Sequence, residues 1–139
     1  MKRILASAVL AAAIVISGAS ASLANRLVAH VDLSKQTMTV KKDGRVLYRW
    51  RVSTARSGYR TPTGQWSPTR MHEMWYSRKY DMSPMPYSIF FYGGYAIHGT
   101  YWHSNFGTPM SHGCVNMRTD QAKQLFYWAP KGTLVVVHQ

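Results

Sequence analysis

Two histidines, a serine and a cysteine lie close together in the second half of the chain, in a pattern that suits nucleophilic catalysis. His98 ends an apolar stretch, and the segment Ser111-His112-Gly113-Cys114 follows after a short connection. A thiolate is the competent form of a cysteine nucleophile, and a nearby imidazole can lower the thiol pKa or take its proton. Both His98 and His112 are candidates for this base. The backbone N–H groups around Gly113 and Cys114 could polarise a carbonyl oxygen.

The first 24 residues have the composition of an export signal. Met1-Lys2-Arg3 is positively charged, Ile4 to Ile16 is almost entirely apolar, and small residues follow. This pattern is typical of a signal peptide, and the apolar stretch is too short to span a bilayer. We expect cleavage after Ala21 or Ala24 and an exported protein, in the periplasm or else in the cell wall or secreted. An uncleaved anchor is the alternative; the mature chain has no predicted membrane segment.

Cys114 is the single cysteine of the 139 residues. This excludes an internal disulfide framework and any multi-cysteine zinc or iron–sulfur site. A free thiol in an oxidising compartment is exposed to mispairing and oxidation, so it needs an explanation. Burial as a small hydrophobic side chain is one explanation. The polar neighbours of Cys114 favour the other, a reactive thiol, since Gly113 would let the backbone approach a ligand closely.

The chain is strongly basic. It has 17 Lys+Arg against 5 Asp+Glu, a formal net charge of +12, and a hydrophobic content of 46% that is too high for a disordered protein. Seven of the basic residues fall between Lys41 and Arg60, with Asp43 as the one acid. Outside the cytoplasm the expected counter-charges are anionic envelope polymers and lipid headgroups rather than nucleic acid. A basic surface that only aids solubility is the alternative.

Alternating apolar and polar residues predict a β-meander at the start of the mature domain, residues 25–139. Two alternating segments, 27–32 and 36–41, are followed by Asp43-Gly44, a strong hairpin signal because a tight primed turn needs positive φ at both central residues. The next strand starts at Val46. We expect it to bury one set of side chains and to expose the alternate set (buried: Val46, Tyr48, Trp50 and Val52; exposed: Leu47, Arg49 and Arg51).

The rest of the chain predicts more strands and one helix. Residues 53–65 contain Gly and Pro at the spacing typical of a loop. Residues 66–71 are predicted as a strand. Residues 71–86 are predicted as an ordered loop that lines a cleft or covers the core. Residues 88–92 and 95–98 are predicted strands on either side of a Gly-Gly turn.

The helix is predicted near the C-terminus, from an N-cap at Thr119 to a stop at Pro130. An apolar stripe marks its buried face (Ala122, Leu125, Phe126 and Ala129). The continuous apolar run 133–137 that follows predicts a central strand. The fold class is therefore mostly β with one short helix.

Two segments of the chain together resemble the signature of the L,D-transpeptidase catalytic domain (YkuD-like) family. They are Ile97-His98-Gly99-Thr100 and Gly107-Thr108-Pro109-Met110-Ser111-His112-Gly113-Cys114-Val115-Asn116-Met117. Segments upstream agree with that family, among them Val31-Asp32-Leu33 and Gly58-Tyr59-Arg60-Thr61-Pro62-Thr63-Gly64. The similarity extends from about Arg26 to Val137.

The resemblance implies a β-sandwich of mixed strands and a cysteine-dependent acyl transfer without a cofactor. Cys114 would attack a peptidoglycan stem tetrapeptide, expel the terminal D-Ala and form a thioester, which an amine of a neighbouring stem would resolve to a 3→3 cross-link. His98 matches the proton donor/acceptor of the family. The remaining matched residues fall into an oxyanion segment and supporting positions (Gly113 and Cys114 with the amide of His112; Ser111 and Asn116). Many relatives carry Arg at the position of Asn116, and others carry Asn.

Three other functions fit some of these residues. A thiol carboxypeptidase or endopeptidase would share the acylation step and use water as the acceptor. A zinc site could take its ligands from His98, His103, His112 and Cys114, although no acidic residue lies near them in the sequence to orient the imidazoles. A non-enzymatic envelope-binding protein would use the basic surface and the aromatic residues but leave the His/Cys cluster idle.

Overall fold

The computed structural model describes residues 27–79, 84–129 and 132–139. The predicted export signal lies outside these residues. None of the helices in the described part of the chain is long and apolar enough to cross a membrane. The elements follow one another as β1 (Leu27–Asp32), β2 (Thr37–Lys42), β3 (Arg45–Arg51), β4 (Gly64–Trp66), β5 (Arg70–Trp75), β6 (Met85–Tyr92), β7 (Tyr95–Gly99), β8 (Val115–Met117), α2 (Thr119–Trp128) and β9 (Leu134–His138).

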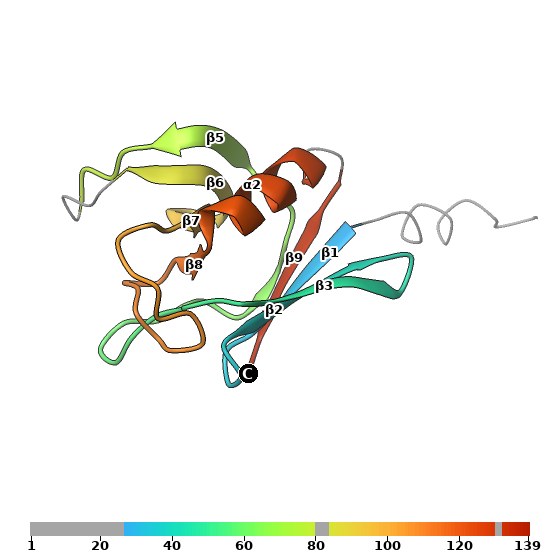
Figure 1. Ribbon diagram of the computed structural model, residues 1–139, viewed down its shortest axis with the longest axis horizontal. Helices are drawn as coiled ribbons and strands as arrows, with labels where there is room; N and C mark the ends of the chain where they lie inside the picture. Colours follow the sequence, from blue (N-terminus) through green and yellow to red (C-terminus); the bar gives the residue numbers. More distant parts are fainter. Residues whose placement is uncertain (1–26, 80–83, 130–131) are drawn as a thin grey trace, which may run out of the picture.

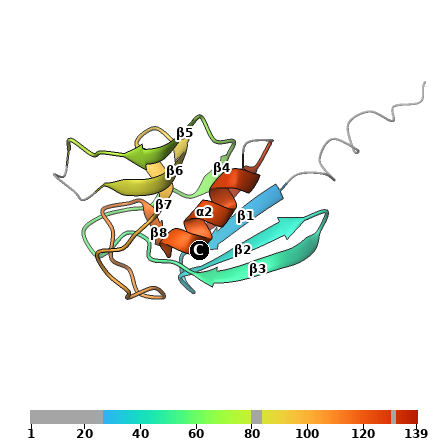
Figure 2. The same cartoon turned by 45° about the horizontal axis from the view of Figure 1, so that its top comes forward.

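The strands form two sheets with one helix between them (Figure 1; Figure 2). One sheet has the order β3-β2-β1-β9-β4 and the other the order β5-β6-β7-β8. Neighbouring strands are antiparallel except for β1 with β9 and β7 with β8, which are parallel. Helix α2 packs on β6 and β7, and it reaches β3 through a hydrogen bond from Gln124 to the Tyr48 hydroxyl. The predicted mostly-β sandwich of mixed strands with one helix is confirmed.

The core is the apolar layer enclosed by the two sheets and the helix. Each contributes fully buried side chains, represented by Val31 and Val40 from the first sheet, Ile89 and Ile97 from the second, and Leu125 from α2. The alternation within each strand decides which side chains enter this layer, because successive residues of a strand point to opposite faces. The other face of β7 and β8 is therefore available for functional side chains.

The N-terminal meander follows its sequence pattern, with one exception. The hairpin turn has the predicted positive φ angles, 51° at Asp43 and 75° at Gly44. Val46, however, is 43% exposed rather than buried. The register of β2 with β3 shifts between Val40 and Lys41, so that Val40 pairs with Tyr48 and Lys41 with Val46. A bulge of this kind adds one residue to a strand and breaks the alternation of its faces.

The segment 66–86 differs more from its prediction. The expected strand 66–71 and the expected loop 71–86 are both wrong in part: β4 ends at Trp66, and β5 covers Arg70–Trp75 and pairs with β6, which begins at Met85. Glu73 and Met74 are exposed because β5 is the edge strand of its sheet, so its apolar pattern is weak.

The C-terminal helix and strand match their predictions apart from the cap. Thr119 is the first residue of α2, and Arg118 takes the N-cap position without a side-chain hydrogen bond to the helix. The guanidinium of Arg118 instead contacts the Asp120 carboxylate at 3.1 Å, beside the N-terminal end of the helix, where a negative charge is favoured. Strand β9 lies between β1 and β4, in the interior of its sheet as predicted.

Candidate active site

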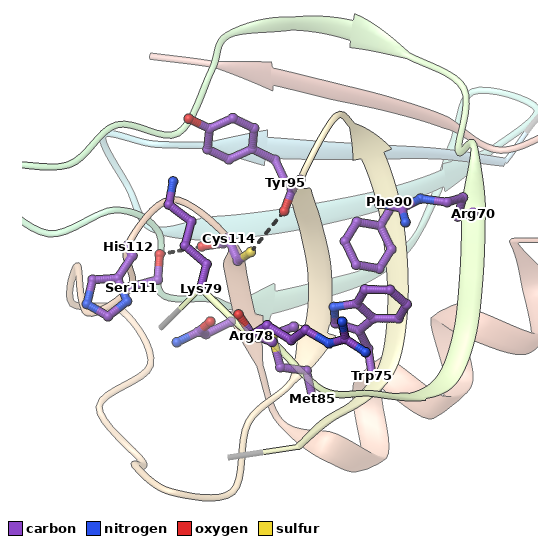
Figure 3. A pocket seen from close by; sticks show the side chains of 13 residues that line it. Arg70, Trp75, Arg78, Lys79, Met85, Phe90, Tyr95, Ser111, His112 and Cys114 are labelled. Atoms are coloured by element: carbon purple, nitrogen blue, oxygen red, sulfur yellow. Dashed lines mark hydrogen bonds between the residues drawn. The ribbon is translucent and has the colours of Figure 1, made fainter. Parts of the chain in front are cut away.

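The Cys114 thiol opens into a cleft of about 370 Å³ (Figure 3). The residue directly precedes β8 and is half-buried. Its S–H group points at the Gly94 carbonyl, with 4.0 Å between the two heavy atoms. Burial raises the pKa of this thiol above its usual value, while a backbone hydrogen bond from Ala96 acts in the opposite direction. The group is therefore a protonated thiol at neutral pH, in contact with the cleft.

The loop that carries Cys114 is closed by its own hydrogen bonds. The Ser111 hydroxyl donates to the Cys114 carbonyl and accepts the N–H of Gly113, at 3.1 Å. The Thr61 hydroxyl donates to the Gly113 carbonyl at 2.8 Å and accepts the N–H of Ala55 at 3.0 Å. Of the predicted oxyanion amides, that of Gly113 is thus engaged within the loop, and that of Cys114 is the candidate considered below.

Gly113 is required by both its conformation and its surroundings. Its φ of 141° lies in a region that L side chains rarely adopt. A Cβ atom there would lie 2.5 Å from Cε1 of Tyr95 and 2.9 Å from the Arg60 carbonyl oxygen. The close approach of these neighbours fixes the path of the backbone just before the thiol.

His98 is fully buried on β7, with a defined tautomer. Its Nδ1 lies 2.9 Å from the Gly99 carbonyl oxygen, which can only accept, so Nδ1 carries the proton. Nε2 then carries the lone pair, and among the described residues it has no hydrogen-bond partner. Burial lowers the pKa of His98 to about 4. The imidazole is a neutral base with one free acceptor, and it stacks on Trp102 with 5.8 Å between the ring centroids.

The parallel pairing of β7 with β8 brings the histidine and the cysteine together. Ile97 pairs with Val115 and His98 with Asn116. Because Ile97 and Val115 both enter the core, His98 and Asn116 point to the opposite face of the sheet, and so does Cys114, two residues before Asn116. The structure thus places His98 and Cys114 on the same face of adjacent segments.

His112, the other candidate base, also lines the cleft, but its ring is held by other partners. A guanidinium nitrogen of Arg56 donates to its Nε2 at 3.2 Å, and the ring contacts Tyr59 edge to face, with centroids 4.7 Å apart. Its imidazole points away from the Cys114 sulfur in Figure 3. Burial and the Arg56 charge both lower the pKa of His112. His98 is therefore the histidine that the strand register places on the same face as the thiol.

Gln36 and Thr54 support the site and have no sequence signal of their own. The Gln36 carboxamide donates to the Thr54 hydroxyl at 2.6 Å and accepts the Thr54 N–H at 2.8 Å. The Thr54 carbonyl in turn accepts the N–H of Ser111 at 3.0 Å. A buried amide in the β1–β2 turn therefore anchors loop 111–114, which carries Cys114. Its sequence neighbours give no indication of this contact, which spans 18 positions.

The opposite wall of the cleft is basic as well as aromatic, and its basic residues were not expected from the sequence. Arg70, Arg78 and Lys79 line the cleft, and none of its described lining residues is acidic. The Arg70 guanidinium lies over the Phe90 ring, 4.3 Å from its centroid, and it is also 5.3 Å from the centroid of Trp75. These residues come from β5, β6 and the segment that follows β5. Part of the segment 71–86, which was expected to line a cleft, therefore does so.

The four residues considered as zinc ligands do not form a metal site. Within the described ranges, no three His, Cys, Asp or Glu side chains are grouped so that they could hold a metal ion. His112 is engaged by Arg56, and His103 contacts Asn116.

Comparisons with known proteins agree with this geometry. The family model of the L,D-transpeptidase catalytic domain (YkuD) matches residues 26–137. The chain is 32% identical over 105 residues to a probable L,D-transpeptidase, ErfK/SrfK, of Escherichia coli K12, with 68% of this chain and 33% of that protein covered. It thus spans about a third of the length of this curated relative.

Solved structures give the same result. An L,D-transpeptidase of Stackebrandtia nassauensis has a TM-score of 0.76 and 30% identity, with 82% of this chain and 56% of that one covered. An L,D-transpeptidase of Xylanimonas cellulosilytica has a TM-score of 0.73 and 28% identity, covering 83% of this chain and 61% of that one. With the family model matching most of its length, the chain belongs to the L,D-transpeptidase catalytic domain family.

Proposed function

We propose that this protein is a cysteine-dependent L,D-transpeptidase that acts on peptidoglycan stem tetrapeptides. Cys114 attacks the carbonyl of the third residue, the bond to the terminal D-Ala breaks, and a thioester forms. The amine of a neighbouring stem, or of a free D-amino acid, then takes the acyl group from the sulfur. The products are a 3→3 cross-link or an exchanged terminal residue. Family membership and the position of Cys114 in the cleft support this proposal.

His98 moves the proton in both half-reactions. Its free Nε2 takes the thiol proton as the sulfur attacks, and the imidazolium gives that proton to the departing D-Ala amine. In the second step the same nitrogen takes a proton from the attacking amine and returns it to the sulfur. With a raised pKa at Cys114 and a lowered one at His98, the resting pair is neutral, so the proton moves during attack rather than before it.

The developing negative charge on the substrate oxygen needs donors that are already in place. The backbone N–H of Cys114 is held in position by the bonds of Ser111 and Thr61 to the loop. A donor fixed in this way stabilises an oxyanion without a reorganisation cost at the moment of reaction.

Export is part of the proposal. Residues 1–24 have a signal-peptide pattern, and peptidoglycan stems lie outside the cytoplasm. The mature domain, residues 25–139, would act in the periplasm or the cell wall. N-terminal sequencing of the secreted protein tests this, with Ser22 or Asn25 as the expected first residue.

The observation that carries the proposal is the free Nε2 of His98 on the same face as the half-buried thiol of Cys114. The test is incubation of the purified protein with stem tetrapeptide, followed by mass spectrometry of peptides and protein. A thioester on Cys114 together with peptide dimers or D-amino-acid exchange is expected. Cys114→Ala serves as the control and should give neither.

Two outcomes would redirect the assignment. Tripeptide alone, with the thioester present, would identify a hydrolase. An unmodified protein, with tetrapeptide intact, would refute acyl transfer on this substrate and favour the envelope-binding function.

A further inference from the structure

His103 makes two hydrogen-bond contacts through its two ring nitrogens. The backbone N–H of Asn105 donates to Nδ1 at 3.1 Å. Nε2 lies 3.1 Å from the carboxamide of Asn116. The ring also packs on Phe106, with 5.1 Å between the centroids. These contacts fix the ring on the loop that follows β7, beside the Asn116 side chain on β8.

The donors and acceptors of this group determine which way Asn116 points. A backbone N–H cannot accept, so Nδ1 of His103 must be the acceptor and Nε2 must carry the proton. An Nε2–H group needs an acceptor opposite it, and the carboxamide supplies one only with its oxygen. The oxygen and nitrogen of a carboxamide occupy nearly the same space, so the side chain can present either one. The contact at 3.1 Å is therefore satisfied by Oδ1 of Asn116.

This orientation changes which atom of Asn116 lacks a partner. With the nitrogen toward His103, Oδ1 of Asn116 is buried and without a partner in the described structure, and the residue is only 1% exposed. With the oxygen toward His103, the N–H₂ group takes that place as a buried donor without a partner among the described residues. An unsatisfied buried donor is costly unless a ligand supplies its acceptor, and Asn116 lines the cleft beside Cys114.

We propose that His103 is a positioning residue that turns the Asn116 carboxamide so that its N–H₂ group faces the cleft and donates to a backbone carbonyl of the acyl-donor peptide. The inference rests on the proposed function for the identity of that peptide. Asn116 is well suited to the task because its backbone is fixed: it exchanges two hydrogen bonds with Ser53, both of 2.8 Å. The side chain then has two rotations, χ1 and χ2, and the hydrogen bond with His103 restricts both of them.

The orientation can be tested without any substrate. Long-range ¹H–¹⁵N correlation NMR of the whole protein at neutral pH distinguishes the two neutral tautomers of histidine, and a His103→Gln variant assigns the signals. The Nε2–H tautomer is expected at His103. In Asn116→Asp, a carboxylate oxygen replaces Oδ1 opposite Nε2–H, so the pKa of His103 should rise by about one unit or more. The Nδ1–H tautomer, or an unchanged pKa in Asn116→Asp, would overturn the inference.

The role of the N–H₂ group is tested by kinetics with stem tetrapeptide. His103→Leu cannot hold the carboxamide, so KM should rise by about tenfold, as for the loss of one hydrogen bond to bound substrate, while kcat changes less. His103→Gln keeps a donor at this position and should recover most of the loss. If Leu and Gln have the same effect, or if kcat falls as far as kcat/KM, His103 does not position a binding group.

A third measurement separates a positioning role from damage to the site. The rate at which iodoacetamide alkylates Cys114 should be the same in His103→Leu and the parent, because the thiol environment is unaltered. A parent enzyme that shows the Nε2–H tautomer but leaves tetrapeptide intact would refute the proposed function alone. An active enzyme with the Nδ1–H tautomer would refute this inference alone.

Discussion

His98 and Asn116 are partners in the parallel pairing of β7 with β8, and each has a buried side-chain polar atom without a partner among the described residues. Buried polar groups in folded proteins are nearly always hydrogen-bonded, so two exceptions at one register position are notable. Both residues point away from the core, toward the face that carries Cys114. The unsatisfied atoms are therefore located where a substrate and a thiol proton would meet them.

The rate at which Cys114 is alkylated should depend on pH as expected for a thiol with a raised pKa. Because burial raises the pKa of the thiol, the rate of alkylation by iodoacetamide should still be rising with pH where N-acetylcysteine has reached its plateau. Measurement of the alkylation rate from neutral to alkaline pH, by mass spectrometry, gives the midpoint. A midpoint below that of the free thiol would indicate a preformed thiolate–imidazolium pair and contradict the neutral pair described above.

The free energy of unfolding should depend on pH through His98. Its pKa falls from 6.5 in the unfolded chain to about 4 in the folded protein, so the unfolded state binds more protons between these values. The free energy of unfolding therefore has its full value, as far as His98 is concerned, above pH 6.5. It decreases as the pH falls from 6.5 to about 4, by about 3 kcal/mol in all. Urea unfolding of the parent and of His98→Gln at a series of pH values measures this contribution. Equal pH slopes for the two proteins would exclude it.

Thr61 should be important for both stability and acylation. Replacing it with Val keeps the shape but leaves the N–H of Ala55 and the carbonyl of Gly113 without their partner. The expected loss is about 2–4 kcal/mol of unfolding free energy, with slower thioester formation. Thr63→Val is the matched control, because Thr63 is exposed. A Thr61→Val protein as stable as the control would show that the hydroxyl is dispensable.

Gly113→Ala should disrupt the loop of the nucleophile. The added Cβ would lie 2.5 Å from Tyr95, in addition to the strain of φ 141°. Gly58→Ala separates the two effects, since Gly58 has φ 86° but no atom within 4 Å of the added Cβ. We expect about 1 kcal/mol of destabilisation in Gly58→Ala and a larger loss, with little acylation, in Gly113→Ala. Equal losses in thermal unfolding would mean that packing on Tyr95 is unimportant.

The exposed arginines of β3 should contribute to binding of anionic envelope polymers. Arg49 and Arg51 are both exposed on this edge strand. Their replacement by Gln should weaken sedimentation with purified sacculi at low salt, while added salt should weaken binding of the parent. The double variant Arg118→Gln/Lys123→Gln removes the same charge from exposed positions elsewhere. If both double variants bind as the parent does, the basic surface serves solubility only.

The sequence indicates the candidate chemical residues more clearly than the residues that support them. Cys114 and His98 stand out by residue type, and the apolar alternation of 95–98 and of Val115 is enough to place them on one face of the sheet. Gln36 and Thr61 give no such signal, because their importance comes from partners 18 and 52 positions away. His112 was an equal candidate in the sequence, and only the contacts of Arg56 and Tyr59 distinguish it from His98.

The errors in the fold have local physical causes. Val46 is exposed because a bulge interrupts the alternation on which its prediction depended. Strand β5 was predicted as part of a loop because an edge strand needs few apolar residues. Thr119 has the residue type of an N-cap, but the helix begins at Thr119 itself, and the pair of Arg118 with Asp120 occupies its start. Each error concerns a boundary or an edge, where tertiary contacts decide between alternatives.

The nucleophile and the facing wall of the cleft belong to separate parts of the chain. Loop 111–114 is tied to Thr54 and Thr61, whereas Arg70, Trp75 and Arg78 come from β5 and the segment after it, and the described residues 84–92 continue that wall. If the proposed function holds, substitutions in this hairpin change which peptides are accepted without moving the sulfur. The division would then give the protein a simple route to new substrate preferences, because one hairpin can diversify while loop 111–114 is preserved.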